Sequence, residues 1–531
     1  MGFDGVTSDH VSGSVPCPDL SATTSSAGDC SCPATALAGF PVPSSQLSVR
    51  TRNKQNQLKP LVIMKFGGTS LADAECIRQV TDIVRDALQT QSALVVVSAM
   101  AGVTDLLVEA GTGAEAGEWA AVSRIFEALR KKHSAAANAL IHSEPRRAEF
   151  EQAVQELLTD GERVCHEAES GNGLSLGSRD FVSSLGERLS VRLVASALTE
   201  CGVASEAIDA TECVVTDTHH GAASPLDELT RERCEFRVRP LLQRGGVPVV
   251  TGFLGATPDG AITTLGRGGS DYSASIIGAA LDAQEVLIWT DVDGFLTADP
   301  RLVTKAHTIP EISYQQAAAL AYFGAKVLHP KTLQPVIERG IPVWIRNTFR
   351  AQQAGTKITL EGPHADAGVK ALTAIQDISL ITLTVTETLH LPSVMHRACA
   401  ALAEARVDTI LTMRTHSPNQ FGLLVRSAHA ERGMDILRNR FDSNDCDGRV
   451  SEIARKDDLS LVTVVGQHLR LLETMATRAA KALHEQELHA IASSENASNC
   501  AVSYVVPMEA MQKTLRTLHQ QLGLDKFHHQ D

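Results

Sequence analysis

The strongest candidate for chemistry is a lysine that stands between an apolar run and two glycines. Lys65 follows the apolar residues 61–64, and Gly67 and Gly68 come directly after Phe66. Four consecutive large apolar residues are typical of a strand that is covered on both faces, as in a parallel sheet. Glycines allow a sharp turn and let backbone N–H groups approach an anion. The segment therefore predicts a polyphosphate site, although it is not the G-x-x-x-x-G-K-[ST] phosphate loop.

A second candidate segment, residues 263–272, combines glycines with both signs of charge. Arg267 lies between Gly266 and Gly268, and Asp271 stands just before a helix-like stretch at 273–281. The planar fork of arginine matches a carboxylate or a phosphate. Aspartate can hold an ammonium group or a magnesium ion. This segment therefore predicts a binding site for a small charged molecule.

Two more polar segments come later in the chain. Thr290 and Asp291 follow the apolar run 286–289, in a segment that ends at Arg301, and Lys326 stands in the last segment, residues 322–330. Together with Ser-Leu-Gly-Glu at 184–187, the four segments resemble those of the aspartate kinases of the amino-acid kinase family, in the same order. The resemblance extends from about residue 61 to about residue 522.

The resemblance implies an enzyme that transfers the γ-phosphoryl group of ATP to the β-carboxylate of L-aspartate. The product would be 4-phospho-L-aspartate, in the first step of lysine, threonine and methionine biosynthesis. Such a transfer depends mainly on positioning and on neutralising the charge of the phosphoryl oxygens. No general base is required, because the attacking carboxylate is already ionised at neutral pH. Magnesium is expected to arrive with ATP, and we predict no metal ligand from the protein.

The resemblance also assigns roles to individual residues. Lys65 and the amides of Gly67 and Gly68 are expected to neutralise the transferring group, with Asp271 as a further catalytic residue. The residues expected to bind aspartate are Thr104, Glu187, Arg267 and Ser270. The residues expected to contact the nucleotide are Lys65, Ser70, Thr290, Asp291, Leu296, Arg301 and Lys326. By charge, Arg267 fits the α-carboxylate of aspartate, whereas Glu187 and Asp271 fit its ammonium group.

At two positions the chain differs from the usual family pattern. Leu296 stands where many relatives carry tyrosine, which removes a ring and a hydroxyl from the predicted nucleotide site. Ala319 stands where relatives usually carry glutamate. We expect the second change to weaken a structural or interface contact more than the chemistry.

The composition favours a globular protein with several domains. A length of 531 residues leaves room for about three domains, and 43% of the residues are hydrophobic. A formal net charge of −14 argues against general nucleic-acid binding, which favours basic patches. No apolar run approaches the length of a membrane span. The eleven cysteines lack C-x-x-C spacing, so we predict reduced thiols, no zinc site and a cytoplasmic protein.

Residues 1–58 are predicted to form a disordered extension. Residues 1–49 contain no lysine or arginine and are rich in small and polar residue types. They match neither a secretory signal nor an arginine-rich transit peptide. An organellar location, with this extension as an atypical targeting segment, is the alternative to a cytoplasmic one.

Residues 59–352 are predicted to form an α/β catalytic domain with the amino-acid kinase fold. Apolar strands at 61–66, 93–98, 247–253, 285–290 and 341–345 alternate with helical stretches. This alternation is typical of a parallel-rich central sheet with helices on both faces. Residues 105–175 are predicted to be a helical insertion, and residues 353–371 a linker.

The last part of the chain is predicted to contain two βαββαβ modules, residues 372–455 and 456–526. Strands and helices recur there with a period of about 80 residues. The modules resemble the ACT domains of the family, which implies an amino-acid effector and a homodimer or homotetramer. Ile410 stands where lysine-sensitive relatives carry an acidic residue. Because a buried lysine side chain needs a carboxylate partner, we expect lysine inhibition to be weak or absent.

Several other functions remain open at this point. Within the same fold, the nearest alternatives are kinases of glutamate, acetylglutamate, carbamate or a nucleotide. A protein of a different class, an amino-acid sensor with an inactive kinase domain, would have no reason to retain so many charged groups. We expect no fused homoserine dehydrogenase, because the sequence contains no G-x-G-x-x-G and leaves no room for a dinucleotide domain after residue 531.

Overall fold

The computed structural model describes most of the chain after residue 58. The described residues are 59–170, 173–325, 327–363, 368–415, 417–441, 449–466, 469–495 and 500–526. The predicted extension 1–58 and Lys326 lie outside them. The described residues all belong to one compact unit.

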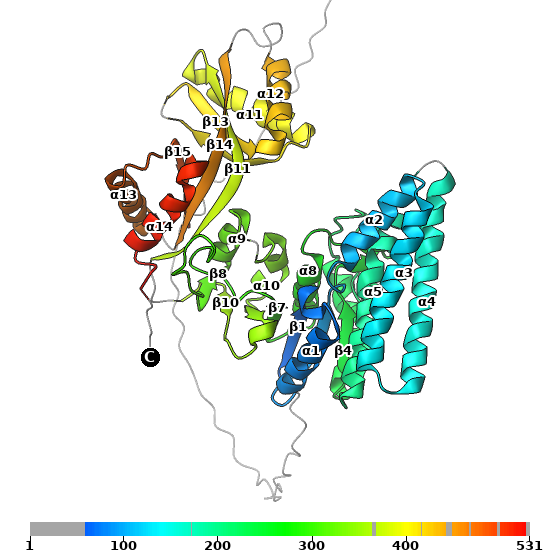
Figure 1. The fold of residues 1–531 in the computed structure, drawn as a ribbon. Coiled ribbons are helices and arrows are strands. Elements are labelled where there is room, and N and C mark those ends of the chain that lie inside the picture. The colour runs from blue at the N-terminus through cyan, green and yellow to red at the C-terminus, as the bar shows by residue number, and fades with distance from the viewer. Residues whose placement is uncertain are drawn as a thin grey trace, which may run out of the picture. The chain divides into compact units, whose positions relative to one another are not determined.

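The first part of the described chain is built around an eight-stranded sheet with the order β3-β4-β2-β1-β7-β9-β10-β8 (Figure 1). Its strands are β1 Leu61–Phe66, β2 Ser92–Val97, β3 Ser205–Ile208, β4 Val247–Thr251, β7 Glu285–Thr290, β8 Glu311–Ser313, β9 Val343–Asn347 and β10 Thr356–Thr359. The six strands from β3 to β9 are parallel, and β10 is antiparallel to β9. The predicted parallel-rich sheet is therefore confirmed.

Both faces of this sheet are buried, as the apolar run at its centre predicts. Side chains of successive strand residues point to opposite faces. Val62 and Met64 of β1 belong to one hydrophobic core, and Ile63 between them belongs to another. A strand with a core on each side favours apolar side chains, which explains the apolar run at residues 61–64, and the charged Lys65 follows only near the end of the strand.

Helices cover the sheet and extend beyond it. They are α1 Ala74–Ala87, α2 Val103–Glu115, α3 Trp119–Leu140, α4 Glu144–His166, α5 Leu176–Glu200, α6 Asp227–Arg237, α7 Arg239–Gln243, α8 Gly269–Ala280, α9 Tyr314–Tyr322 and α10 Gln334–Ile337. In Figure 1, α2 to α5 pack side by side as one block of helices. The predicted helical insertion at 105–175 is confirmed by α2, α3 and α4.

The second part of the chain forms a six-stranded sheet with the order β12-β13-β11-β14-β16-β15. Its strands are β11 Val369–Val385, β12 Thr409–Arg414, β13 Gln420–Arg426, β14 Val450–Gly466, β15 Ala492–Glu495 and β16 Ala501–Pro507. Its helices are α11 Leu391–Glu404, α12 Ser427–Phe441, α13 Leu469–Glu485 and α14 Met511–Gln521. The elements from β11 to β14 follow the predicted βαββαβ order.

The two modules share their central strands. Residues 378–385 of β11 pair with β13 and with the first half of β14, whereas residues 369–375 pair with the second half of β14. The first half of β11 therefore lies beside the strands of the second module. The stretch 353–371, predicted as a linker, contains β10 and the start of β11. The domain boundaries themselves stay a prediction.

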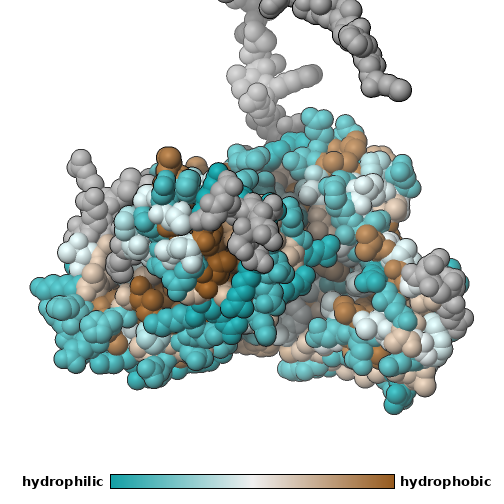
Figure 2. Space-filling view, turned by 90° about the horizontal axis from the view of Figure 1, so that it is seen from above, coloured by the Kyte–Doolittle hydropathy of each residue, from teal (hydrophilic) through white to brown (hydrophobic). Residues whose placement is uncertain are grey.

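The helices of the described residues include no candidate for a membrane span. Hydrophilic residues predominate on the face shown in Figure 2, and hydrophobic residues occur there in smaller groups. No helix in this part of the chain is long and apolar enough to cross a bilayer.

Candidate active site

Lys65 forms an ion pair with Asp271 near the carboxyl end of β1, a central strand of the sheet. Lys65 is the fifth residue of β1, and Asp271 lies in the first turn of α8. The Nζ atom of Lys65 contacts Oδ1 of Asp271, and the two side chains are only 9% and 16% exposed. A buried charge of this kind requires a partner. The two segments that the sequence singled out for chemistry therefore meet in space.

Glu187 is a buried carboxyl group close to this pair. It lies on α5 and is 4% exposed. Burial raises the pKa of Glu187 to about 8, although a hydrogen bond from the Ala99 backbone and the charge of Lys65 both act to lower it. Its Oε2 atom has no hydrogen-bond partner among the described residues. An ionisable group held in this way is typical of a functional site, where a ligand supplies the missing contact.

Arg267 is held on a turn that only glycines allow. Gly266 and Gly268, on either side of it, have φ angles of 77° and 71°. A Cβ atom on Gly268 would also lie 2.9 Å from Cβ of His329. The guanidinium of Arg267 is exposed and forms no hydrogen bond or ion pair within the described residues. It is therefore available to a ligand.

Ser270 and Thr104 stand at the N-termini of two helices. Ser270 is 9% exposed and packs closely on Gly252. A Cβ atom added to Gly252 would lie 2.7 Å from the Cβ atom of Ser270. Thr104 is the second residue of α2, two positions after Gly102, whose backbone is left-handed. Because α2 and α8 begin beyond the carboxyl ends of parallel strands, their positive ends face the edge at which α/β proteins bind ligands.

The Gly67 amide, predicted to contact the transferring group, has a partner within the protein. The N–H group of Gly67 donates to the carbonyl oxygen of Trp289 at 3.1 Å, because the pairing of β1 with β7 continues beyond the end of the strand. A contact between this amide and an anion would replace that bond, and the predicted role of Gly67 stays a prediction. The Gly68 amide makes no such bond in the described chain, and a Cβ atom on Gly68 would lie 3.1 Å from the Ala99 carbonyl oxygen.

Three of the predicted nucleotide contacts, Asp291, Leu296 and Arg301, lie on the loop of residues 291–308, directly after Thr290. Thr290 ends β7, and its hydroxyl donates to the Asp291 carboxylate at 3.1 Å. Leu296 forms an antiparallel bridge with Thr308. Arg301 is 86% exposed and pairs with Asp299 at 2.6 Å.

Two other predicted nucleotide contacts are not placed at this loop. Ser70 is fully buried, and its hydroxyl lies 2.7 Å from the Thr348 hydroxyl. The structure therefore gives Ser70 a contact inside the protein, and its predicted role at the nucleotide stays a prediction. Lys326 is outside the described residues.

Asp180, which the sequence did not single out, joins the segments around the Arg267 turn. Asp180 is 4% exposed and accepts hydrogen bonds from the Thr264 hydroxyl at 2.6 Å, the His220 ring at 2.7 Å and the Gly221 amide at 3.1 Å. It therefore ties α5 to the strand β6 (Ile262–Thr264), which leads into the Arg267 turn. A signal was present, because Asp180 precedes Glu187 by seven residues and so shares its helix face.

Comparisons with known proteins agree with this fold. Residues 60–347, more than half of the chain, match the model of the amino acid kinase family. The bifunctional aspartokinase/homoserine dehydrogenase 2, chloroplastic, of Arabidopsis thaliana is 29% identical over 473 residues, which cover 87% of this chain and 51% of that protein. Aspartokinase 3, chloroplastic, of the same plant is 34% identical over 339 residues, covering 63% of this chain and 59% of that protein.

A solved structure shows the same similarity in three dimensions. The crystal structure of E. coli aspartokinase III in complex with aspartate and ADP (R-state) has a TM-score of 0.71 and 29% identity, and the match covers 87% of this chain and 99% of that one. The chain spans about half the length of the bifunctional relatives that it matches. With its parallel sheet and its site at the carboxyl ends of the strands, this chain belongs to the amino acid kinase family.

Proposed function

We propose that this protein is an aspartate kinase, which transfers the γ-phosphoryl group of ATP to the β-carboxylate of L-aspartate. The observation that carries the proposal is the buried Lys65–Asp271 pair together with the Glu187 carboxyl, whose Oε2 atom has no hydrogen-bond partner among the described residues. A cation for phosphoryl oxygens and a carboxyl group for an ammonium group lie side by side. The aspartokinases among the similar proteins support the same assignment.

In this proposal, aspartate is held through its α-substituents, which leaves the β-carboxylate free to react. The fork of Arg267 would pair with the α-carboxylate, and the Glu187 carboxylate would accept from the ammonium group. Ser270 and Thr104 would add hydroxyl contacts at the two helix N-termini. Holding the reactants in one orientation supplies a large part of the rate enhancement in such a transfer.

Lys65 would act on the transferring phosphoryl group. Asp271 neutralises Lys65 in this structure and so keeps the ammonium group in place at the end of β1. When ATP binds, Lys65 would turn towards the phosphoryl oxygens. A cation that is held in place in a buried site stabilises their negative charge more strongly than it would in water. ATP would bring Mg²⁺, which neutralises the phosphates. Thr290, Asp291, Leu296 and Arg301 would contact the rest of the nucleotide.

A coupled assay of ADP formation tests the proposed reaction. We expect ADP release with L-aspartate, and a rate at least about 100-fold lower with L-glutamate or with no acceptor, because an extra methylene moves the carboxylate away from the phosphoryl group. Hydroxylamine should trap the acyl phosphate that forms. Faster turnover with glutamate would assign the chain to another branch of the family. Absence of turnover with every acceptor, despite ATP binding, would favour an amino-acid sensor.

The pKa of Glu187 predicts a pH dependence of aspartate binding. With a pKa of about 8 in the free protein, Glu187 is mostly protonated at pH 7 and ionises as the pH rises. Only the carboxylate attracts the ammonium group of aspartate. We therefore expect KM for aspartate to fall several-fold between pH 7 and pH 8.5. The Glu187→Gln variant, which cannot ionise, should have a higher KM without this fall. The same fall in the variant would show that another group titrates.

The tandem modules at the end of the chain support a regulated enzyme. We propose that they bind an amino-acid effector and that the protein is a homodimer or homotetramer. A structure of E. coli aspartokinase III in complex with lysine and aspartate (T-state) is 28% identical to this chain. Here Ile410 is 7% exposed and packs in a hydrophobic core, so it offers no carboxylate to a lysine side chain.

This absence of a carboxylate at Ile410 leads to a prediction about inhibition. We expect lysine at micromolar concentrations to leave the aspartate kinase rate unchanged. Titration of lysine, threonine and methionine into the assay, with the chain's mass measured by light scattering, checks both regulation and assembly. Strong inhibition by micromolar lysine would show that another carboxylate, such as Asp408, replaces the expected partner.

The location of the enzyme is a separate proposal. We propose that it works in the cytoplasm, with an organelle as the alternative because the plant relatives are named chloroplastic. Microscopy of the full chain with a C-terminal fluorescent tag distinguishes the two locations.

A further inference from the structure

The loop 291–308, which carries the proposed nucleotide contacts, is attached to the last helix of the second regulatory module. Thr297 lies within this loop and is 3% exposed, and His519 lies on α14 and is 2% exposed. The Thr297 hydroxyl and the Nε2 atom of His519 are 3.0 Å apart, although 222 residues separate them. A hydrogen bond so deeply buried is expensive to break, because neither group can turn to water.

Thr297 uses all of its polar groups in this arrangement. Its N–H group donates to the His307 carbonyl at 2.9 Å, and its carbonyl accepts from the Leu372 amide at 2.8 Å. Its hydroxyl also accepts from the His307 amide at 3.2 Å. Thr297 therefore closes the loop upon itself and joins it both to β11 and to α14.

Further contacts join the loop to α14 on each side of Thr297. Ala298 and Val303 share a hydrophobic core with Leu518 and other residues of the second module. The Arg516 side chain donates to the Leu302 carbonyl at 2.9 Å. One side of the loop is thus fixed by α14, while Arg301 on the loop is 86% exposed.

We propose that α14 positions the loop 291–308 for nucleotide binding, with His519 as the positioning residue. This inference rests on the proposed function, because the loop's nucleotide contacts do. His519 does not touch the nucleotide. His519 holds Thr297 through the hydrogen bond between their side chains. Thr297 in turn fixes the loop backbone, and this backbone determines the positions of Leu296 and Arg301. The affinity for nucleotide then depends on the packing of the second regulatory module, which gives that module a direct connection to the catalytic domain.

The test is the nucleotide affinity of His519→Leu, measured by calorimetry with ADP and Mg²⁺ and no acceptor. We expect Kd to rise about 10-fold, since a loop that has lost a buried hydrogen bond must be ordered by the nucleotide itself. In the kinase assay, KM for ATP should rise by a similar factor, and KM for aspartate should stay within about 2-fold. His519→Gln, whose side-chain amide can replace the Nε2 group, should recover most of the affinity.

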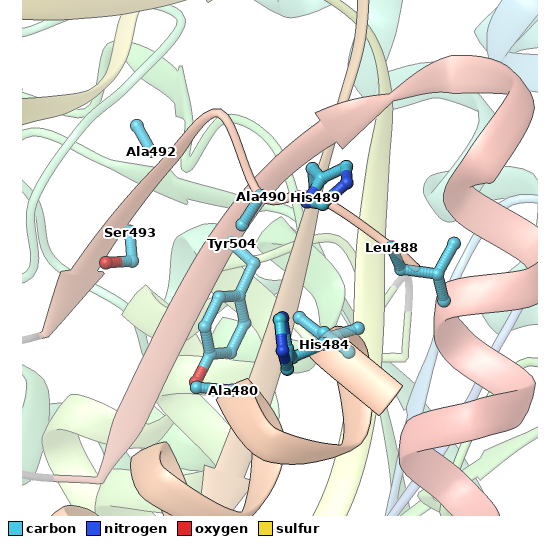
Figure 3. A pocket seen from close by; sticks show the side chains of 9 residues that line it. Ala480, His484, Leu488, His489, Ala490, Ala492, Ser493 and Tyr504 are labelled. Carbon is cyan, nitrogen blue, oxygen red and sulfur yellow. The ribbon is translucent and has the colours of Figure 1, made fainter. Parts of the chain in front are cut away.

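The matched control is a histidine of the same module that does not contact the loop. His484 is exposed and lines a pocket between α13, β15 and β16 together with Leu483, Leu488 and Tyr504 (Figure 3). His484→Leu should leave the Kd for ADP unchanged. If His519→Leu fails to fold, the exposed contact of Arg516 replaces it, and Arg516→Ala should raise the Kd about 3-fold.

The coupling between the two side chains separates a positioning role from a general loss of stability. Thr297→Val should raise the Kd as His519→Leu does, and the double variant should be no worse than either single variant. An unchanged Kd in a folded His519→Leu variant, even with a lower Tm, overturns the proposal. Since ADP binding is measured without aspartate, the result holds for α14 even if the acceptor proves to be another compound.

Discussion

Lys65→Met is expected to lower kcat by roughly 100-fold or more, because it removes a cation that acts mainly on the transition state. The KM values for ATP and aspartate should change much less. The structure adds a complication that the sequence does not reveal. Methionine at this position leaves Asp271 without its partner in a site that is largely closed to water. Loss of one member of a buried pair costs about 3 to 5 kcal/mol of folding stability.

A double variant separates the two effects of this substitution. In Lys65→Met with Asp271→Asn, no unpaired charge remains, so the Tm should return towards that of the original protein while kcat stays low. Lys131, which is 76% exposed on α3, provides a matched control: Lys131→Met should leave both quantities unchanged. A folded Lys65→Met variant with near-normal turnover would remove Lys65 from the reaction.

Arg267→Lys is expected to raise KM for aspartate by at least about 10-fold and to leave KM for ATP within about 2-fold. Lysine keeps the charge but loses the planar fork that pairs with a carboxylate through two hydrogen bonds. The substitution should not disturb the fold, because the Arg267 side chain is exposed and the turn depends on Gly266 and Gly268.

A second substitution, at a proposed nucleotide contact, provides the comparison for Arg267→Lys. Arg301→Lys, on the loop 291–308, should show the reverse pattern, with the larger change in KM for ATP. If Arg267→Lys instead changes KM for ATP, Arg267 is a phosphate ligand, and the roles of the two arginines must be exchanged. Both variants and the original protein should unfold at similar temperatures, since neither side chain is buried.

The two C-terminal modules illustrate which structural features a local sequence pattern predicts and which it does not. Their strands and helices were predicted because alternation and helical spacing are properties of short segments. The assignment of strands to modules was not, because β11 and β14 each run through both halves of one sheet. The whole sheet determines which strands pair. The alternation of apolar and polar residues along β11 would be the same whether β11 paired with β13 or with the second half of β14, so the sequence pattern does not distinguish these partners.

For the catalytic domain, the sequence by itself determined the elements and the kinds of residue that the site would contain. The apolar strands at 61–66 and 285–290 coincide with β1 and β7. Lys65 lies near the end of β1, and its charge acts on the buried Glu187. The short strand β3, Ser205–Ile208, was missed because it has no apolar run and depends on pairing with β4.

Only the tertiary structure decided which of these groups meet. Lys65 and Asp271 are 206 residues apart, and their contact exists because β1 and the helix α8 lie at the same edge of the sheet. The pairing of β1 with β7 gives the Gly67 amide a bond to the Trp289 carbonyl, a partner that the local sequence does not reveal. Burial raises the pKa of Glu187, and Asp180 fixes the strand before Arg267. Residue type is a local property that the sequence gives directly. The burial of a side chain and its contacts depend on segments that are distant in the chain, and it is burial and contacts that determine the charge and the position of that side chain.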